Sequence, residues 1–284
     1  MVNEQIPFVM AMATISGSPP FPILVLDDDA AVSVAAVAPL AARLGAGLTG
    51  AESIHGLLQD WSRNFEALCR VVSALDDAEL GKYTRSAFAA LEFFDLVAPI
   101  SVPRQIFEVE GAVTCRPVSS LAGPRAKVPM PPDSTHLTAG TSLAAVVGAP
   151  SYRATHDEAA QSVAGLMVAT RYRDSAGGVV APALLPTGPY FVPMQFCPPE
   201  LTARIAFNGE TGVDSAGTSA AAISALQKVS RECHLFPGDL VLMPLGDQGN
   251  VALGDGDIIE TAIAGLGQQT TNIMKESTHA NSRD

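Results

Sequence analysis

Residues 137–148 read LTAGTSLAAVVG, and residues 163–171 read VAGLMVATR. Both runs are short, apolar and partly β-branched, which is typical of strands buried on both faces, and a glycine ends the first run. Between them, residues 151–162 have turn chemistry followed by helical spacing. Asp157 and Glu158 fall in the first turn of this segment, where acidic side chains suit the helix dipole. We therefore predict two neighbouring buried strands joined by a helix.

The C-terminal third also has the pattern of a sheet. Residues 201–207 alternate between apolar and polar, and they lead into Asn208-Gly209, a pair that favours a two-residue hairpin turn. Glycine–aspartate turns at 238–239 and within 254–257 each precede an apolar run. These signals predict a β-rich end to the fold.

The N-terminal part of the chain has a different organisation. Residues 8–14 and 21–26 have strand patterns, and a turn rich in glycine and proline separates them. Residues 30–44 are alanine-rich and predicted to be helical in part, with an interruption at Pro39. Residues 53–75 place apolar side chains at spacings of three and four, which predicts one long amphipathic helix.

Composition limits the classes of function. The chain has 284 residues, 48% of them hydrophobic, so it can bury a sizeable core. The net charge of −12, without a run of lysine or arginine, argues against binding to nucleic acid or to anionic membranes. Four scattered cysteines without metal-ligand spacing indicate reduced thiols. With no apolar run long enough for a signal or a span, we expect a cytoplasmic protein.

The order of these elements resembles the fumarylacetoacetate hydrolase superfamily. The apolar run that ends at Gly148, the Pro186-Thr187-Gly188-Pro189 turn and the two glycine–aspartate turns carry the resemblance. It implies an α/β fold of the α+β, β-rich kind, in which a rolled mixed β-sheet main domain follows a small N-terminal domain. The expected boundaries are 1–98 for the small domain with its linking helix, 99–274 for the main domain and 275–284 for a disordered tail. Residues from 270 onward lose the apolar pattern and are expected to fray. The resemblance also implies a homodimer.

The same resemblance marks positions where this chain departs from the family. Family members hold a magnesium or calcium ion with Glu-x-Glu on the first central strand and an aspartate at the end of the second. Those positions fall here on Gly140, Ser142 and Arg171. A hard divalent cation requires several charged oxygen ligands, so we expect neither a metal site nor a cofactor. The family's catalytic histidine position falls on Arg116, and the lid segment that follows it is shorter here.

The residues that remain suggest a second kind of chemistry. A guanidinium can stabilise an enolate or a carboxylate by paired hydrogen bonds, which Arg171 and Arg116 could provide. Glu108, Glu110 or His136 could then act as the general base. The candidates for binding the substrate are Tyr172, Arg173 and Ser142.

Plain structural readings stay open for several of these residues. Arg171 can instead pair with Asp174 or another acid. Residues 172–178 have the composition of a flexible loop, in which Arg173 would be a solvated charge. His136 can be an ordinary residue at the end of a strand.

Three functions are compatible with this sequence. The first is a metal-independent enzyme that isomerises, cyclises or decarboxylates an enolisable dicarbonyl small molecule, for which secondary metabolism is one setting. The second is a non-catalytic binding or scaffold protein on the same fold. The third is a hydrolase or lyase that cleaves a carbon–carbon bond. Fold alone does not choose among them.

Overall fold

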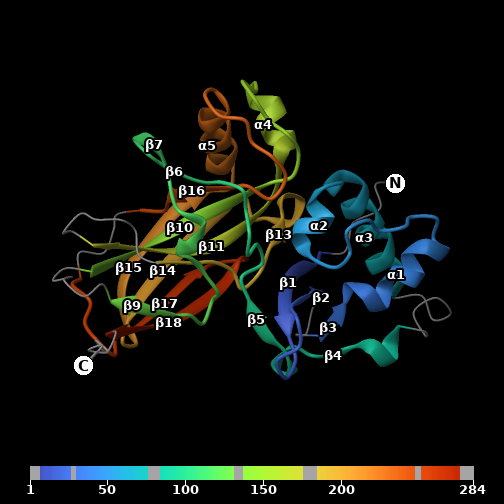
Figure 1. Cartoon of the computed structure of the whole chain (residues 1–284), viewed down its shortest axis with the longest axis horizontal. Coiled ribbons are helices and arrows are strands. Elements are labelled where there is room, and N and C mark those ends of the chain that lie inside the picture. The colour runs from blue at the N-terminus through green and yellow to red at the C-terminus, as the bar shows by residue number, and fades with distance from the viewer. Residues whose placement is uncertain are drawn as a thin grey trace, which may run out of the picture.

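The structure is a computed structural model that describes residues 7–26, 30–75, 84–130, 137–174, 184–246 and 251–275. The N-terminal part is a five-stranded sheet, in the order β4-β3-β2-β1-β5, with three helices beside it (Figure 1). Its elements are β1 (Val9–Thr14), β2 (Phe21–Val25), β3 (Ala30–Ser33), α1 (Val34–Arg43), α2 (Ile54–Leu58), α3 (Trp61–Leu75), β4 (Ala89–Ala90) and β5 (Asp95–Val97). The predicted first two strands are confirmed as the antiparallel pair β1–β2.

The main part contains two larger sheets. The six-stranded sheet has the order β13-β11-β10-β16-β6-β7, and the five-stranded sheet has the order β15-β14-β17-β18-β9. A short parallel pair, β12 with β8, forms a separate two-stranded sheet. The strands are β6 (Ile106–Glu110), β7 (Ala112–Cys115), β8 (Leu121–Ala122), β9 (Lys127–Met130), β10 (Leu137–Val147), β11 (Val163–Asp174), β12 (Leu185–Pro186), β13 (Val192–Pro193), β14 (Glu200–Phe207), β15 (Glu210–Thr218), β16 (Leu240–Pro244), β17 (Ile258–Ile263) and β18 (Gly267–Lys275). The chain is therefore a mixed, sheet-rich α/β protein, as the sequence predicted.

The two strands with which the sequence analysis began are the centre of the main part. β10 and β11 pair along their whole length, from Leu137 opposite Asp174 to Val147 opposite Val163. The helix between them, α4 (His156–Ser162), starts with a capping box formed by Thr155 and Glu158. It lies with α5 (Ala220–Ser230) on the outer side of the six-stranded sheet (Figure 1). The predicted neighbours are confirmed.

The predicted hairpin is also confirmed. β14 and β15 are joined by Asn208 and Gly209, whose φ angles of 52° and 83° are both positive. A turn with two positive φ angles matches the twist of antiparallel strands, and asparagine followed by glycine tolerates it best.

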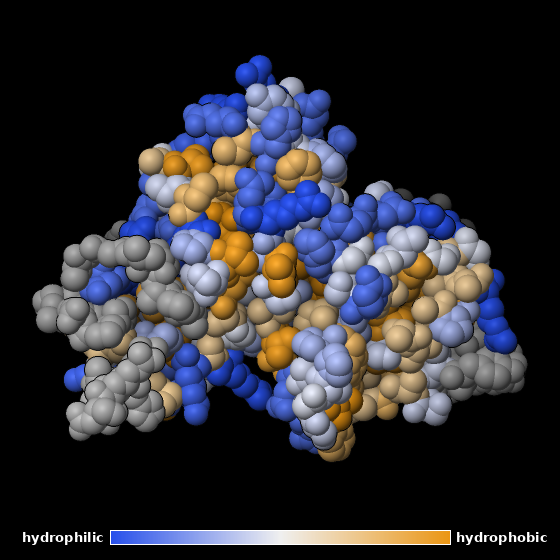
Figure 2. Space-filling view, viewed as in Figure 1, coloured by the Kyte–Doolittle hydropathy of each residue, from blue (hydrophilic) through white to orange (hydrophobic). Residues whose placement is uncertain are grey.

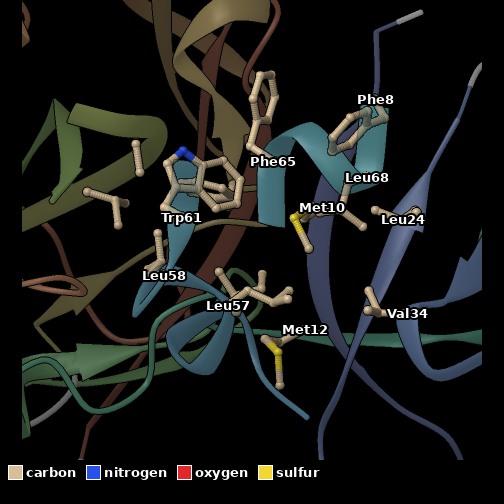
Figure 3. Close-up of a cluster of buried hydrophobic side chains, with 14 of the residues drawn as sticks. Phe8, Met10, Met12, Leu24, Val34, Leu57, Leu58, Trp61, Phe65 and Leu68 are labelled. Carbon is tan, nitrogen blue, oxygen red and sulfur yellow. The ribbon is translucent and has the colours of Figure 1, made fainter. Parts of the chain in front are cut away.

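One apolar cluster joins the N-terminal part to the main part. Figure 3 shows Phe8, Met10 and Leu68 gathered between α3 and the β1–β2 pair, with Trp61 at the other end of the cluster. The same buried cluster includes Ala144, Met167 and Leu242 from the six-stranded sheet. On the face drawn in Figure 2, hydrophobic residues gather in the middle of the molecule, where the two parts meet. One face of the six-stranded sheet is therefore turned toward the N-terminal part.

Two helix predictions were wrong in detail. Pro39 does not interrupt its helix, because α1 continues through it. Pro39 and Ala35 are both exposed, so the Ala35 carbonyl that a proline cannot bond faces water, while Val37, Leu40 and Ala41 stay buried.

Residues 53–75 form two helices instead of one. The buried Asn64 side chain donates to the carbonyl of Leu57 at 2.8 Å and also bonds Thr49. In a continuous helix that Leu57 carbonyl would accept from the backbone of Trp61. Here the Leu57 carbonyl accepts from the Asn64 side chain and, at 3.3 Å, from the backbone N–H of Asp60, so the bond that would have joined α2 to α3 is not formed.

The prediction of a frayed end from residue 270 was wrong as far as residue 275. β18 pairs with β17 on one side and with β9 on the other. Its inward positions are Gln269, Thr271 and Ile273, of which two are polar, so no apolar alternation is visible in the sequence. The buried side chains of Gln269 and Thr271 form hydrogen bonds in place of apolar packing. Residues 276–284, which include most of the predicted tail, lie outside the described residues.

Candidate functional site

Five charged side chains meet on the face of the six-stranded sheet that is turned toward the N-terminal part. Arg116 Nε donates to Glu108 Oε2 at 2.7 Å, and Arg173 Nη2 donates to Glu108 Oε1 at 2.7 Å. Arg171 Nη1 donates to Glu110 Oε2 at 2.9 Å and also to Glu108 Oε1. Arg173 bonds Glu110 as well. We call these residues the arginine cluster.

Strand parity places the arginine cluster on one face. Successive side chains of a strand point to opposite sides, so Arg171 and Arg173 share a side of β11, as Glu108 and Glu110 share a side of β6. β11 and β6 are separated by β10 and β16, and therefore by about 14 Å at the usual spacing of strands. Gly140 lies directly opposite Arg171 and has no side chain. The Arg171 side chain can therefore extend across β10 toward β6.

The arginine cluster carries one net positive charge, because three guanidiniums face two carboxylates. Arg171 is fully buried, at 0% exposure. That burial, together with repulsion from Arg173, lowers the pKa of Arg171 to about 9. Burial and Arg173 also lower the pKa of Arg116 to about 10, against an opposing effect of Glu110. Both guanidiniums remain charged at neutral pH, in surroundings that favour an additional anion.

Several buried polar atoms around Arg171 have no hydrogen-bond partner in the described part of the chain. They are Nε and Nη2 of Arg171, Nη1 of Arg116, Oγ of Ser142 and Oγ1 of Thr187. Ser142 and Thr187 are both register partners of Ala169, two residues along β11 from Arg171. A buried donor without a partner is costly, so such atoms commonly mark the position of a ligand or a bound water.

The structure brings together most of the residues proposed from sequence. Arg171, Arg116, Glu108 and Glu110 are in contact, and Ser142 shares their face. Arg171 pairs with acids, as the structural reading proposed, but its partners come from β6.

Arg173 is not a solvated loop charge. β11 continues to Asp174, and the Arg173 side chain is held by both glutamates. The prediction of a loop at residues 172–174 was wrong because the ion pairs extend the strand.

The other two predicted residues have different positions. Tyr172 lies on the opposite face, where it is 1% exposed and its hydroxyl is 2.5 Å from Thr271 Oγ1. Burial raises the pKa of Tyr172 well above its usual range. His136 lies outside the described residues, and its role as a base stays a prediction.

Sequence reasoning missed Thr187 as a functional candidate. It lies in the proline-glycine turn that served only to recognise the fold. Its contact with Ala169 comes from tertiary structure, and no local pattern indicates it.

The residues present do not fit a divalent metal ion. Within the described ranges, no three histidine, cysteine, aspartate or glutamate side chains are grouped so that they could hold one. The two acids nearest Arg171 already accept hydrogen bonds from guanidiniums. A metal cation at this position would be repelled by three guanidinium groups.

Comparison with known proteins agrees with this fold. The family described as "Fumarylacetoacetate (FAA) hydrolase C-terminal" matches residues 94–274. No curated relative matches the chain. Among the described residues, no helix is long and apolar enough to cross a membrane.

Several solved structures are similar over almost their whole length. A probable 2-hydroxyhepta-2,4-diene-1,7-dioate isomerase from Mycobacterium abscessus has 22% identity and a TM-score of 0.71, covering 96% of this chain and 100% of that one. Maleylpyruvate hydrolase from Sphingobium sp. SYK-6, in complex with manganese(II) and pyruvate, has 17% identity and a TM-score of 0.73, with coverages of 95% and 100%. Fumarylacetoacetate hydrolase from Exiguobacterium antarcticum has 17% identity and a TM-score of 0.73, with coverages of 94% and 100%. At these identities the similarity concerns the fold.

Proposed function

Because the chain belongs to the fumarylacetoacetate hydrolase family, we propose that it acts on a small carboxylic acid with an enolisable carbonyl group, and that the arginine cluster binds the anionic oxygens of that substrate. The neighbouring folds named above include an isomerase and hydrolases, so family membership leaves the type of reaction open.

The unpartnered donors of Arg171 are the observation that carries this proposal. Nε and Nη2 are buried and free of partners in the described residues, while Nη1 is held by the glutamates. A guanidinium offers two parallel N–H groups to a carboxylate or to an enolate. A hydrogen bond to a charged group contributes about 1.5–3 kcal/mol, and more when water is excluded. An anion at this position would also balance the net positive charge.

Glu108 and Glu110 differ in how freely each can accept a proton from a substrate. Glu108 is buried and receives hydrogen bonds from all three arginines, so its lone pairs are occupied. Glu110 has 39% of its side chain exposed and can turn toward a substrate. In this proposal Glu110 takes the proton next to the substrate carbonyl, Arg171 stabilises the resulting enolate, and the hydroxyls of Ser142 and Thr187 orient the bound acid.

This set of residues favours some reactions over others. It can hold a developing negative charge, which is sufficient for isomerisation, cyclisation or decarboxylation. Among the described residues, no three histidine, cysteine, aspartate or glutamate side chains are grouped so that they could hold a metal ion and acidify a bound water. The enzyme in this proposal is therefore metal-independent, and hydrolysis is the less favoured alternative.

A non-catalytic binding protein is the second candidate. The observation in its favour is that both carboxylates already accept guanidinium hydrogen bonds, which is also what a purely structural ion-pair network requires.

Hydrogen–deuterium exchange at C3 of pyruvate and of 2-oxoglutarate tests the proposal directly. An enzyme that stabilises an enolate should catalyse this exchange, which nuclear magnetic resonance measures. Arg171→Ala should lower the exchange rate at least about tenfold, because 1.4 kcal/mol corresponds to one decade. Arg171→Lys should restore only part of it, since an ammonium lacks the planar pair of donors.

Two further variants keep this test interpretable. Arg173→Ala removes a half-exposed member of the arginine cluster, in case Arg171→Ala does not fold. Arg204→Ala is the matched control, because Arg204 pairs with Asp214 on the exposed side of another sheet. Binding of the acids without any exchange, in a protein that folds normally, would support the non-catalytic candidate and refute the enzyme.

A further inference from the structure

A pocket lies at the opposite end of β10 from the arginine cluster. It has a volume of about 410 Å³ and is open to solvent between the start of α3, the turn after β10 and the loop before β16. Its lining includes Trp61, Arg104, Pro150 and Phe236. Gly148 also lines it and is eight residues from Gly140, so the two sites are separated by about 27 Å along the strand.

One wall of this pocket continues into a column of stacked groups. The guanidinium of Arg104 lies over the ring of Phe236, at 5.1 Å from its centroid. Phe236 is stacked near His234 at 6.4 Å, and His234 is stacked on Tyr152 at 3.9 Å with an interplanar angle of 9°. Arg153 lies over the ring of Tyr152, at 5.0 Å from its centroid. This chain of contacts therefore begins and ends with a guanidinium, at Arg104 and at Arg153.

A buried carboxylate fixes the end of the column that lines the pocket. Asp239 is 0% exposed and accepts hydrogen bonds from the backbone of Phe236 at 2.9 Å and from Gln105, at 3.2 Å from the backbone and 3.0 Å from the side chain. These bonds tie the segment that carries Arg104 to the loop that carries Phe236. The two side chains are thus held in place before any ligand arrives, which lowers the entropic cost of binding.

Arg104 gives this pocket one exposed cation. In the described part of the chain no acid lies within 4.0 Å of its guanidinium, although Arg104 interacts electrostatically with the buried Asp239 carboxylate. The acid that lines the pocket, Asp60, pairs with Arg63 at 4.0 Å. Pro150 and Pro237 line the pocket beside the cation, together with the accessible edge of Trp61, which is 7% exposed. A stacked guanidinium keeps its N–H edge available for a carboxylate.

We propose that this pocket binds a planar aromatic carboxylate, with its ring against Trp61 and the prolines and its carboxylate on Arg104. The ligand needs both features. A ring without charge does not engage the guanidinium, and an aliphatic acid does not match the flat aromatic surface. The site is separate from the arginine cluster and does not depend on the function proposed there.

Trp61 provides a local reporter, because it is the only tryptophan of the chain. Titration of the full chain with benzoate and with 4-hydroxybenzoate should change Trp61 fluorescence in a saturable way. Benzamide and cyclohexanecarboxylate are the matched probes that lack the charge and the aromatic ring, and each should bind at least about tenfold more weakly, a difference of 1.4 kcal/mol. Free N-acetyltryptophanamide, titrated in parallel, corrects for direct quenching by the probes.

Variants at the two ends of the column separate this site from general effects. Arg104→Ala should weaken benzoate binding at least about tenfold, and Arg104→Lys should recover part of it. Arg153→Ala removes the guanidinium at the far end and should change the affinity less than about twofold. Arg173→Ala, in the arginine cluster, should leave the Trp61 signal unchanged. A fluorescence change that survives Arg104→Ala, or that benzamide produces equally well, would overturn the proposal.

Discussion

The two faces of β11 carry two buried polar networks of opposite kinds. On one face, Thr170 Oγ1 donates to Gln269 Oε1 at 2.6 Å, and Gln269 Nε2 donates to the carbonyls of Val168 and Gly188. Tyr172 and Thr271 complete this network between the two large sheets. On the other face, Arg171 keeps two donors without partners in the described residues.

The comparison shows how buried polar groups that only hold the structure together differ from buried polar groups that are suited to bind a ligand. Neutral groups that satisfy each other hold the two sheets together and leave nothing for a ligand. The arginine cluster has excess charge, and its unused donors are on Arg171 and Arg116, which are also buried. A buried network that is complete stabilises, whereas an incomplete one costs free energy unless a ligand completes it. Adjacent residues of one strand thus serve two purposes.

Loss of the Glu108 carboxylate should have the largest effect on stability. Glu108→Gln leaves three guanidiniums with one carboxylate, so we expect a loss of about 3–5 kcal/mol in the free energy of unfolding. Chemical denaturation measures it. The control Asp214→Asn breaks an exposed ion pair and should change stability by less than about 0.5 kcal/mol. Equal effects of the two variants would show that the arginine cluster is not a buried charge network.

On the opposite face, Tyr172→Phe should have a smaller effect. The variant keeps the ring and removes one hydrogen bond, while Thr271 retains its contact with the Ile259 carbonyl. We expect a loss of about 1 kcal/mol, within the usual range for one hydrogen bond. Binding of 2-oxo acids, measured by calorimetry, should not change. A strong loss of binding would mean that the two faces are not separate.

A rise in pH should move binding and stability in opposite directions. Between pH 9 and 10, Arg171 and then Arg116 lose their protons in the folded chain, because their pKa values are lowered to about 9 and about 10. The arginine cluster then loses its positive charge, and affinity for pyruvate should fall. The unfolded chain keeps those protons and so binds more of them than the folded chain. The contribution of these two groups to stability therefore increases with pH in this window. Constant affinity from pH 7 to pH 10.5 would contradict this account.

Thr187→Val should have the smallest effect on stability. Its hydroxyl is buried without a partner in the described residues, so a near-isosteric apolar replacement removes a cost. We expect a change in stability between zero and a gain of about 1 kcal/mol, together with weaker binding or slower exchange of pyruvate. Thermal unfolding and the exchange assay, carried out on the same sample, separate the two effects. A large loss of stability would show that Thr187 has a structural partner.

The sequence predicted the strands well where they are continuous apolar runs, as in β10 and β11, or where apolar residues recur at period two, as in β14. It failed at β18, because Gln269 and Thr271 are buried through hydrogen bonds and give no apolar alternation. Arg116 and Arg171 could be proposed because they fall on the family's catalytic histidine and metal-ligand positions, and Glu108 and Glu110 because a carboxylate can act as a general base. Strand parity alone could have separated Tyr172 from Arg171. Thr187 could not be found, since its position depends on a contact between distant segments.

The register that places Gly140 opposite Arg171 also restricts which insertions and deletions strand β11 can accept. Deletion or insertion of one residue within β11 would turn Arg171 toward the interior between the sheets and Tyr172 toward the arginine cluster, because each residue beyond the change would switch sides. Both networks would then fail together. A change of two residues would preserve the parity of every position beyond it. Related sequences should therefore vary in this strand by substitution, or by pairs of residues, and not by single gaps.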